Sequence, residues 1–189
     1  MKRRILITLC VGLGLIVTAL CAFRDRLPRL RYKTWPFMTI VDLALHGYAK
    51  EHSGSFPNAQ NGCAALELLY PNYVVTGKEL AGLTGDQKRA VAALVSSQSI
   101  SNFTSWVYVP GFRSDDDPRL AILWESSSQV RVSGLSFQKT RPVLLLDHEV
   151  TNVPVAKWDS FMQLQEALRA DAVKRKSEPG TPTNVPAVP

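Results

Sequence analysis

The feature that most constrains this chain is a run of 19 residues without a charged side chain, ILITLCVGLGLIVTALCAF, at positions 5–23. As a helix, such a run spans about 28 Å, which matches the hydrocarbon thickness of a lipid bilayer. The alternative is a cleaved signal peptide, whose apolar core usually has about 7–15 residues and ends at a small-x-small cleavage site. Here the run is longer, and its candidate site, Ala19-Leu20-Cys21, fits that pattern poorly. We therefore expect residues 1–23 to be a retained anchor that contacts the lipid bilayer through residues 5–23.

Positive charge lies beside this run rather than in the body of the chain. Residues 1–33 carry eight basic residues and one acidic residue, whereas residues 34–168 carry ten basic and thirteen acidic residues. The formal net charge of +6 therefore does not come from the globular region. Nucleic-acid binding is not expected, because it requires a basic surface with interleaved aromatic side chains. Residues 24–36 form a basic connector bracketed by prolines.

The charges on the two flanks do not fix the orientation of the predicted span. Counting Lys and Arg alone, the positive-inside rule places the more basic C-terminal flank in the cytoplasm. A very short basic N-terminal tail is, however, typical of a signal-anchor. Charge alone therefore leaves both orientations open.

Apolar periodicity divides the remaining chain mainly into helices followed by strands. Three- and four-residue spacing of apolar side chains predicts helices over residues 36–50, 62–70, 86–96 and 157–174. Runs of β-branched, aromatic and apolar residues predict strands over residues 104–109, 120–125, 142–147 and 149–155. This order indicates an α+β fold in which helices pack on a small antiparallel sheet. A proline-rich composition without apolar periodicity predicts a disordered tail over residues 176–189.

Three finer expectations concern packing. The helix over residues 36–50 is expected to place Ile40, Leu43 and Ala44 against the sheet. The strand over residues 142–147 is continuously apolar, which is typical of a central strand. Thr84 is a candidate N-cap of the third helix, because its hydroxyl can accept a hydrogen bond from a backbone N–H.

The three histidines offer few metal-ligand patterns. His46 and His52 lie six residues apart on one predicted helix, so they point to opposite sides and cannot bind one ion together. His148 lies in a tight corner between Asp147 and Glu149, and it contributes to a metal site only if residues distant in sequence join it. No HExxH or CxxC pattern occurs. We therefore expect structural or solvent-exposed histidines.

Asp115, Asp116 and Asp117 form the densest acidic cluster. Calcium favours several oxygen ligands from one loop, which makes these residues calcium candidates. The spacing of an EF-hand is missing, so a solvated turn before Pro118 is the favoured interpretation. No nucleophile elbow, phosphate loop or dinucleotide fingerprint occurs either. From these motifs we expect no catalytic residues and no cofactor.

Four segments follow one another in the body of the chain: LALHGYAKEHSGSFPN at 43–58, ALELLYPNYV at 65–74, YVPGFRSDDDPRLAILWE at 108–125 and RPVLLLDHEVTNVPVAKWDSFMQLQEAL at 141–168. In their order and spacing they resemble the pseudopilin-like family, which is related to the subunits of type II secretion systems and type IV pili. That family has a helix ending in Y-A-x-D/E-x-x-G-x-F/Y-P and a Y-x-P-G strand. A hairpin of the form N-V-L-F-x-D-G-H-V and a terminal helix follow.

The resemblance implies a pilin-like α+β domain over residues 37–175. It implies a single-pass protein of the inner membrane whose C-terminal domain lies in the periplasm. Such a protein is not an enzyme and acts through contacts with other envelope or secretion-apparatus proteins. The alternative is a metal-dependent envelope hydrolase that uses the Asp147-His148 corner together with residues 115–117.

The chain departs from the family pattern at two places. Prepilins carry a Gly-Phe-Thr-Leu-x-x-Glu start, whereas this chain starts MKRRILITLC and has no acidic residue between Met1 and Phe23. We therefore expect no prepilin-peptidase cleavage and no self-assembled fibre. At the hairpin corner, His148 stands where the family has glycine, at a position that tends to require a positive φ.

Overall fold

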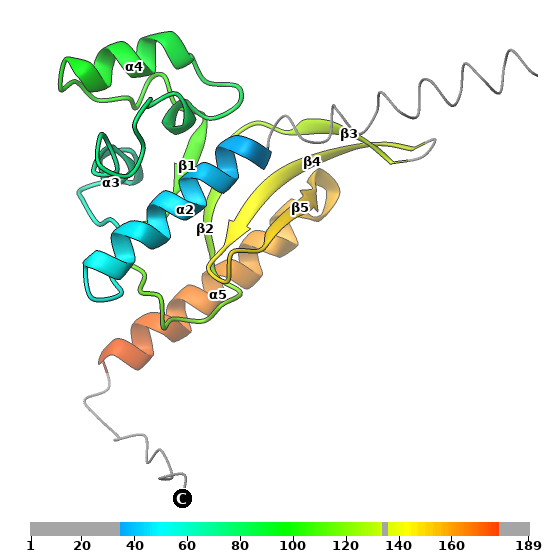
Figure 1. The fold of residues 1–189 in the computed structure, drawn as a ribbon. Coiled ribbons are helices and arrows are strands. Elements are labelled where there is room, and N and C mark those ends of the chain that lie inside the picture. The colour runs from blue at the N-terminus through cyan, green and yellow to red at the C-terminus, as the bar shows by residue number, and fades with distance from the viewer. Residues whose placement is uncertain (1–34, 134–135, 178–189) are drawn as a thin grey trace, which may run out of the picture.

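The computed structural model describes residues 35–133 and 136–177. The elements in chain order are α2 (Trp35–Glu51), α3 (Gly62–Glu67), the 3-10 helix η1 (Glu79–Ala81), α4 (Gln87–Val95), β1 (Trp106–Tyr108), β2 (Ala121–Glu125), β3 (Gln129–Ser133), β4 (Ser136–Leu145), β5 (Val150–Pro154), the 3-10 helix η2 (Val155–Lys157) and α5 (Trp158–Ser177) (Figure 1). All strand pairs are antiparallel, so the expected α+β fold with a small antiparallel sheet is confirmed.

The predicted anchor over residues 1–23 lies outside the described residues, as does most of the connector over residues 24–36. Among residues 35–133 and 136–177, no helix is long and apolar enough to span a membrane. The last helix extends to Ser177, and the rest of the predicted tail lies outside the described residues.

Strand β4 is the centre of the sheet, as its continuous apolar run predicted. Thr140 pairs with Pro154 of β5 and with Gln129 of β3, while Val143 pairs with β5 and with Trp124 of β2. A residue that pairs with two strands has one strand on each side. Strand β5 therefore lies along one edge of β4, and β2 and β3 lie along the other edge. Strand β1 pairs with β2 and completes the five-stranded sheet.

The hairpin of β3 and β4 is a difference from the expected strands. Strand β4 begins at Ser136, six residues before the predicted start, and pairs over its first half with β3. The sequence of β3, QVRVS, alternates polar and apolar residues, which is the period of a strand with one face toward solvent. A search for continuous apolar runs does not detect a strand with this alternating pattern.

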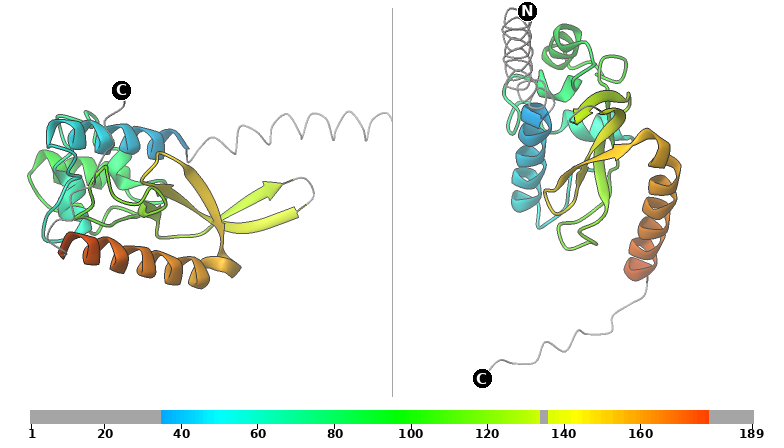
Figure 2. Two further views of the ribbon diagram at one scale, coloured as in Figure 1. Left: turned by 90° about the horizontal axis from the view of Figure 1, so that it is seen from below. Right: turned by 90° about the vertical axis from the view of Figure 1, so that its right-hand side faces the viewer.

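Helices cover both faces of the sheet, with α2 on one side and α5 on the other (Figure 2). Every residue of β2 is therefore buried. The larger core contains Val41, Leu45, Ile122 and Leu144 together with side chains of α3 and α4, and with Leu168 and Ala172 of α5. The second core, toward the start of α5, contains Ala121, Trp124, Val143 and Val153, with Trp158, Phe161 and Met162 packed against it.

The face that α2 turns to the sheet differs from the expected one. Ala44 is buried as predicted, but Ile40 is 39% exposed and Leu43 is 65% exposed. The buried stripe contains Val41 and Leu45, with Met38 and Ala49 at its ends. Apolar residues occur nearly all round this helix, so periodicity alone is compatible with more than one buried face. The face that packs also carries Asp42 and His46 inward.

Local capping positions the shorter helices. The side chain of Asn61 accepts a hydrogen bond from Ala64 N at 2.9 Å and starts α3. Helix α4 is capped by Asp86, which accepts from Arg89 N at 3.1 Å, and not by Thr84 as expected. The hydroxyl of Thr84 instead donates to the buried carboxylate of Glu125 at 2.7 Å.

Tyr73 contacts the C-terminal end of α2, where its hydroxyl donates a hydrogen bond to Glu51. This hydrogen bond, with smaller effects of burial and of the charge on Glu51, raises the pKa of Tyr73 from 10.0 to about 12. Because the pKa is raised in the folded state, the stabilising contribution is complete below about pH 10. It is lost as the pH rises from 10 toward 12.

We expect Glu51→Gln to lower the pKa of Tyr73 from about 12 part of the way toward 10.0, because the amide oxygen still accepts the hydrogen bond but carries no negative charge. An NMR titration of the chain with ring-labelled tyrosine measures this change. Glu149→Gln, a substitution at an exposed residue, serves as the control and leaves the Tyr73 titration unchanged. A Tyr73 pKa that does not respond to Glu51→Gln contradicts the assignment.

Candidate functional site

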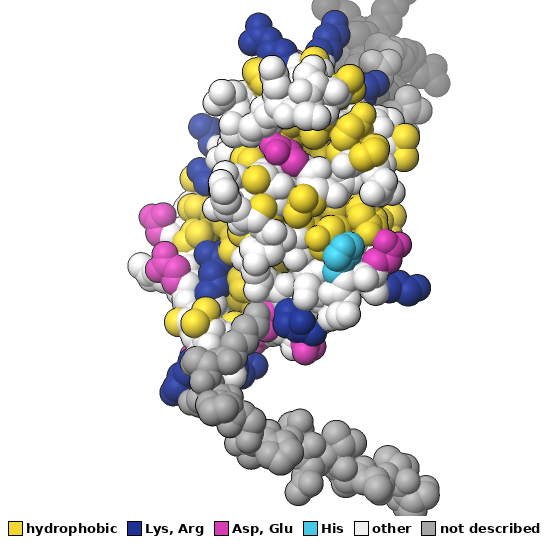
Figure 3. Space-filling model, turned by 90° about the vertical axis from the view of Figure 1, so that its left-hand side faces the viewer, with side chains coloured by type: hydrophobic (Ala, Val, Ile, Leu, Met, Phe, Trp, Pro, Cys, Tyr) yellow, Lys and Arg dark blue, Asp and Glu magenta, His cyan; other side chains and the backbone are white. Residues whose placement is uncertain are grey.

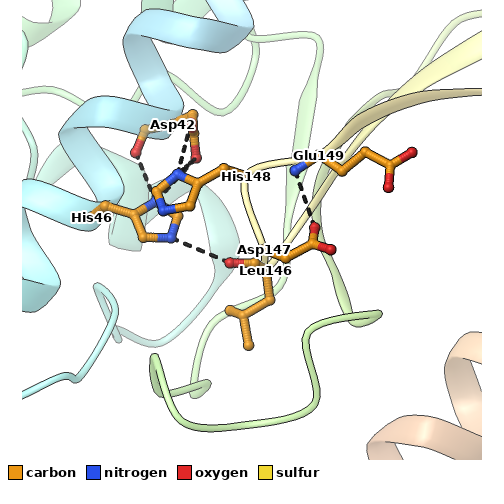
Figure 4. A network of polar contacts seen from close by, with 6 residues as sticks. All are labelled: Asp42, His46, Leu146, Asp147, His148 and Glu149. Atoms are coloured by element: carbon orange, nitrogen blue, oxygen red, sulfur yellow. Dashed lines mark hydrogen bonds and ion pairs between the residues drawn. The ribbon is translucent and has the colours of Figure 1, made fainter.

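Three ligand-type side chains meet where α2 passes the corner between β4 and β5. Asp42 and His46 lie four residues apart on α2 and therefore share one face of the helix. The corner adds His148, which is 106 residues from Asp42 in sequence. Figure 4 shows the two imidazole rings beside the Asp42 carboxylate. We call these residues the Asp42–His46–His148 cluster.

The distances within the cluster are those of hydrogen-bonded groups. His46 Nδ1 lies 3.0 Å from Asp42 Oδ1, and His148 Nδ1 lies 3.1 Å from Asp42 Oδ2. The two imidazole rings stack with their centroids 3.5 Å apart. One ligand atom from each residue can be chosen so that all three lie within 4.8 Å of one another.

Burial differs among the three residues. Asp42 is only 7% exposed, His46 is half-buried, and the side chain of His148 is 54% exposed. Burial alone would raise the pKa of Asp42, but hydrogen bonds and positive charge from His46 and His148 outweigh it and lower that pKa. Burial would lower the pKa of His46, but hydrogen bonds with Asp42 outweigh it and raise that pKa.

A backbone carbonyl orients the ring of His46. His46 Nε2 lies 3.3 Å from the carbonyl oxygen of Leu146, and a carbonyl only accepts hydrogen bonds. Nδ1 faces the carboxylate and the backbone oxygen of Asp42, which also only accept hydrogen bonds, so these contacts do not select one neutral tautomer. In the charged ring, Nδ1 donates as well, to the carboxylate and to the backbone oxygen of Asp42.

The backbone of His148 is in the left-handed region, with φ 70°. The expected positive φ at this corner is therefore confirmed, and histidine occupies it at a cost of about 1 kcal/mol relative to glycine. Strained residues of this kind concentrate at functional sites. Here the strained residue carries a ligand-type side chain that contacts Asp42.

Asp147, the expected partner of His148, is not part of the cluster. Its Oδ1 accepts a hydrogen bond from Glu149 N at 3.0 Å, and both acidic side chains point away from the cluster in Figure 4. His52 also lies apart from it, stacked on Tyr48 with ring centroids 3.7 Å apart. His46 and His52 thus have separate surroundings, as their spacing predicted.

The three calcium candidates bond within their own loop. Asp115 lies 3.2 Å from Arg113 Nε, and Asp116 accepts from Arg113 N at 2.7 Å. Asp117 pairs with Arg119 at 2.8 Å, and these hydrogen bonds lower the pKa of Asp117 to about 2. In the part of the chain that the structure describes, they do not join the groups of three or more ligand-type side chains close enough to share an ion.

Sequence reasoning singled out His148 and His46 but missed Asp42. The signal was present, because an acid and a histidine at i and i+4 on a largely apolar helix place two ligands on one face. Which face packs on the corner between β4 and β5 was not readable from the spacing.

No protein-family model, no curated protein sequence and no solved structure matches the chain. Without an ion, the cluster links α2 to the corner through one buried carboxylate and two imidazoles. With an ion, the same three groups supply two nitrogen ligands and one oxygen ligand.

Proposed function

We propose that this chain is a membrane-anchored, non-enzymatic pilin-like protein of a secretion or pilus-type envelope apparatus. Residues 5–23 hold it in the inner membrane, and the domain lies in the periplasm. It acts through contacts with other proteins of that apparatus. The proposal is supported by the sequence resemblance and by the way α2 is used in the fold.

The observation that carries the proposal is the exposed face of α2. One face of this helix packs on the sheet, while Ile40 and Leu43 remain exposed on the other. Along the described stretch from Pro36 to Gly47, Asp42 is the only acidic or basic residue apart from His46, and it is buried. An uncharged, apolar helix face of this kind is typical of an interaction surface.

The position of this face argues for one occupant, a helix of another envelope subunit anchored in the same membrane. The face belongs to the helix that follows the predicted anchor in sequence, so a partner anchored alongside can pack on it. Leu68 and Val75, which follow α3, and Val95, the last residue of α4, are also exposed. Figure 3 shows hydrophobic side chains on the face of the molecule that carries α3 and α4. These three residues are separate from the α2 face in sequence.

We expect Leu43→Asp to dissociate the chain from its envelope partner while leaving the fold intact, because an exposed position tolerates charge but an apolar interface does not. Native electrophoresis of membranes solubilised in mild detergent measures the size of the complex. The matched control is Leu164→Asp, at an exposed leucine of α5 on the opposite side of the sheet. The α2 face is not the interface if only Leu164→Asp dissociates the complex, or if neither variant dissociates it.

A second candidate, a metal-dependent envelope hydrolase, is favoured by one observation. His148 lies within reach of a carboxylate and a second histidine from another element. Three protein ligands and an open position are the arrangement of catalytic zinc sites. The role given to Asp147 is not supported, because its carboxylate caps its own corner. Zinc-dependent hydrolysis of model esters by the full chain, lost in His148→Gly, is the result that this candidate requires.

A further inference from the structure

We propose that Asp42, His46 and His148 form a binding site for a divalent transition-metal ion of the zinc type. This inference does not rest on the proposed pilin-like function, because the site needs neither the anchor nor a partner protein, whereas the hydrolase candidate requires it. It assigns a ligand to a cluster that the pilin-like interpretation leaves without a role.

The first argument is geometric. Two ligand atoms at about 2.1 Å from a tetrahedral ion lie about 3.4 Å from each other. The two nitrogen-to-oxygen distances in the cluster are 3.0 Å and 3.1 Å, and the ligand atoms lie within 4.8 Å of one another. The two rings are stacked with 27° between their planes, so the exposed ring of His148 has to turn away from His46 before both Nδ1 atoms and one Asp42 oxygen surround a single ion. The ion replaces the protons that the two nitrogens now share with the carboxylate.

The second argument is the support around the ligands. A metal-bound histidine usually donates its other N–H to a carbonyl or carboxylate, which fixes the ring. His46 does so through Nε2 to the carbonyl of Leu146, at 3.3 Å. Asp42 belongs to α2 and is buried where this helix meets the corner between β4 and β5. Its carboxylate already lies within hydrogen-bond distance of both histidines.

The third argument is His148 itself. It occupies a backbone conformation, φ 70°, that glycine adopts more easily. The same residue is the most exposed of the three, so solvent reaches the side of the cluster that an ion enters. One coordination position is left for water or for a ligand from another molecule.

The ligand types select among metals. Two imidazole nitrogens and one carboxylate oxygen suit zinc, cobalt and neighbouring transition ions. Calcium and magnesium prefer sets made of oxygen ligands. A bound transition ion links α2 to the corner between β4 and β5 more firmly than hydrogen bonds alone, so binding stabilises the fold.

The test uses the full chain without an affinity tag, purified in mild detergent and freed of metal with a chelator. Cobalt(II) is titrated and followed by visible absorption, and zinc is titrated by calorimetry and by thermal unfolding. We expect one ion per chain, visible bands typical of low coordination number, and a rise of several degrees in melting temperature with zinc. Calcium and magnesium at the same concentration produce no rise.

His148→Gly is the decisive variant, because glycine accepts the positive φ and removes a ligand without straining the backbone. We expect at least a 100-fold loss of zinc affinity with the fold retained. Asp42→Asn provides a second ligand deletion, and His52→Ala is the control because its ring stacks on Tyr48 outside the cluster. The inference is overturned if zinc does not bind the wild-type chain, or if it binds His148→Gly with unchanged affinity.

Discussion

Leu144→Ala is expected to lower the free energy of unfolding by about 2–5 kcal/mol. Leu144 is fully buried in the central strand β4, where β5 and β2 pair on either side and the core under α2 covers it. Truncation removes apolar contacts and leaves a cavity that the paired strands cannot close by moving. Urea denaturation of the full chain in mild detergent, followed by tryptophan fluorescence, measures the change.

The matched control is Leu164→Ala on α5. Leu164 is 54% exposed, and surface substitutions of this kind change stability by less than about 0.5 kcal/mol. Equal losses in the two variants would show that β4 is not the centre of the core.

Glu125→Ala is expected to cost about 1–3 kcal/mol of stability, because it removes a charged acceptor shared by Thr84 and by the buried hydroxyl of Ser105. Glu125 is fully buried at the end of β2. Its Oε1 accepts hydrogen bonds from Thr84 N at 3.1 Å, from the Thr84 hydroxyl and from the Ser105 hydroxyl. These bonds join the loop before α4 to the sheet, so the loss is expected in equilibrium denaturation and in hydrogen exchange of that loop.

Glu125→Gln separates the hydrogen bonds from the charge. The amide oxygen of the Gln side chain still accepts these hydrogen bonds. The second carboxylate oxygen of Glu125, Oε2, has no hydrogen-bond partner among the described residues, so its replacement by an amide nitrogen breaks no hydrogen bond. We expect a loss of less than about 1 kcal/mol. A Gln variant as unstable as the Ala variant would assign the effect to the charge and contradict the hydrogen-bond account.

The fold class and most of the elements were predictable from the sequence, because apolar spacing records which side chains are buried. The run PVLL at the end of β4 is apolar at every position because helices cover both faces of the sheet. The β3 hairpin was missed because its strand alternates polar and apolar residues and contains no long apolar run.

The candidate site was less predictable, because it depends on which face of α2 is buried. Apolar residues lie on several sides of the helix, and of the expected contact residues Ile40, Leu43 and Ala44 only Ala44 is buried. The face that packs carries Asp42 and His46 to His148, and this contact between distant segments has no local signature. The glycine-type corner was predictable, since the turn geometry is local, and φ at His148 is positive as expected.

Protease accessibility in a bacterial host tests the proposed anchored domain most directly. Membranes are separated and washed with alkaline carbonate, and spheroplasts with an intact inner membrane are treated with protease. The chain is expected in the carbonate-resistant membrane fraction, with its domain degraded in spheroplasts while a cytoplasmic marker stays intact. A chain released by carbonate, or a domain protected until the inner membrane is lysed, would contradict the proposal.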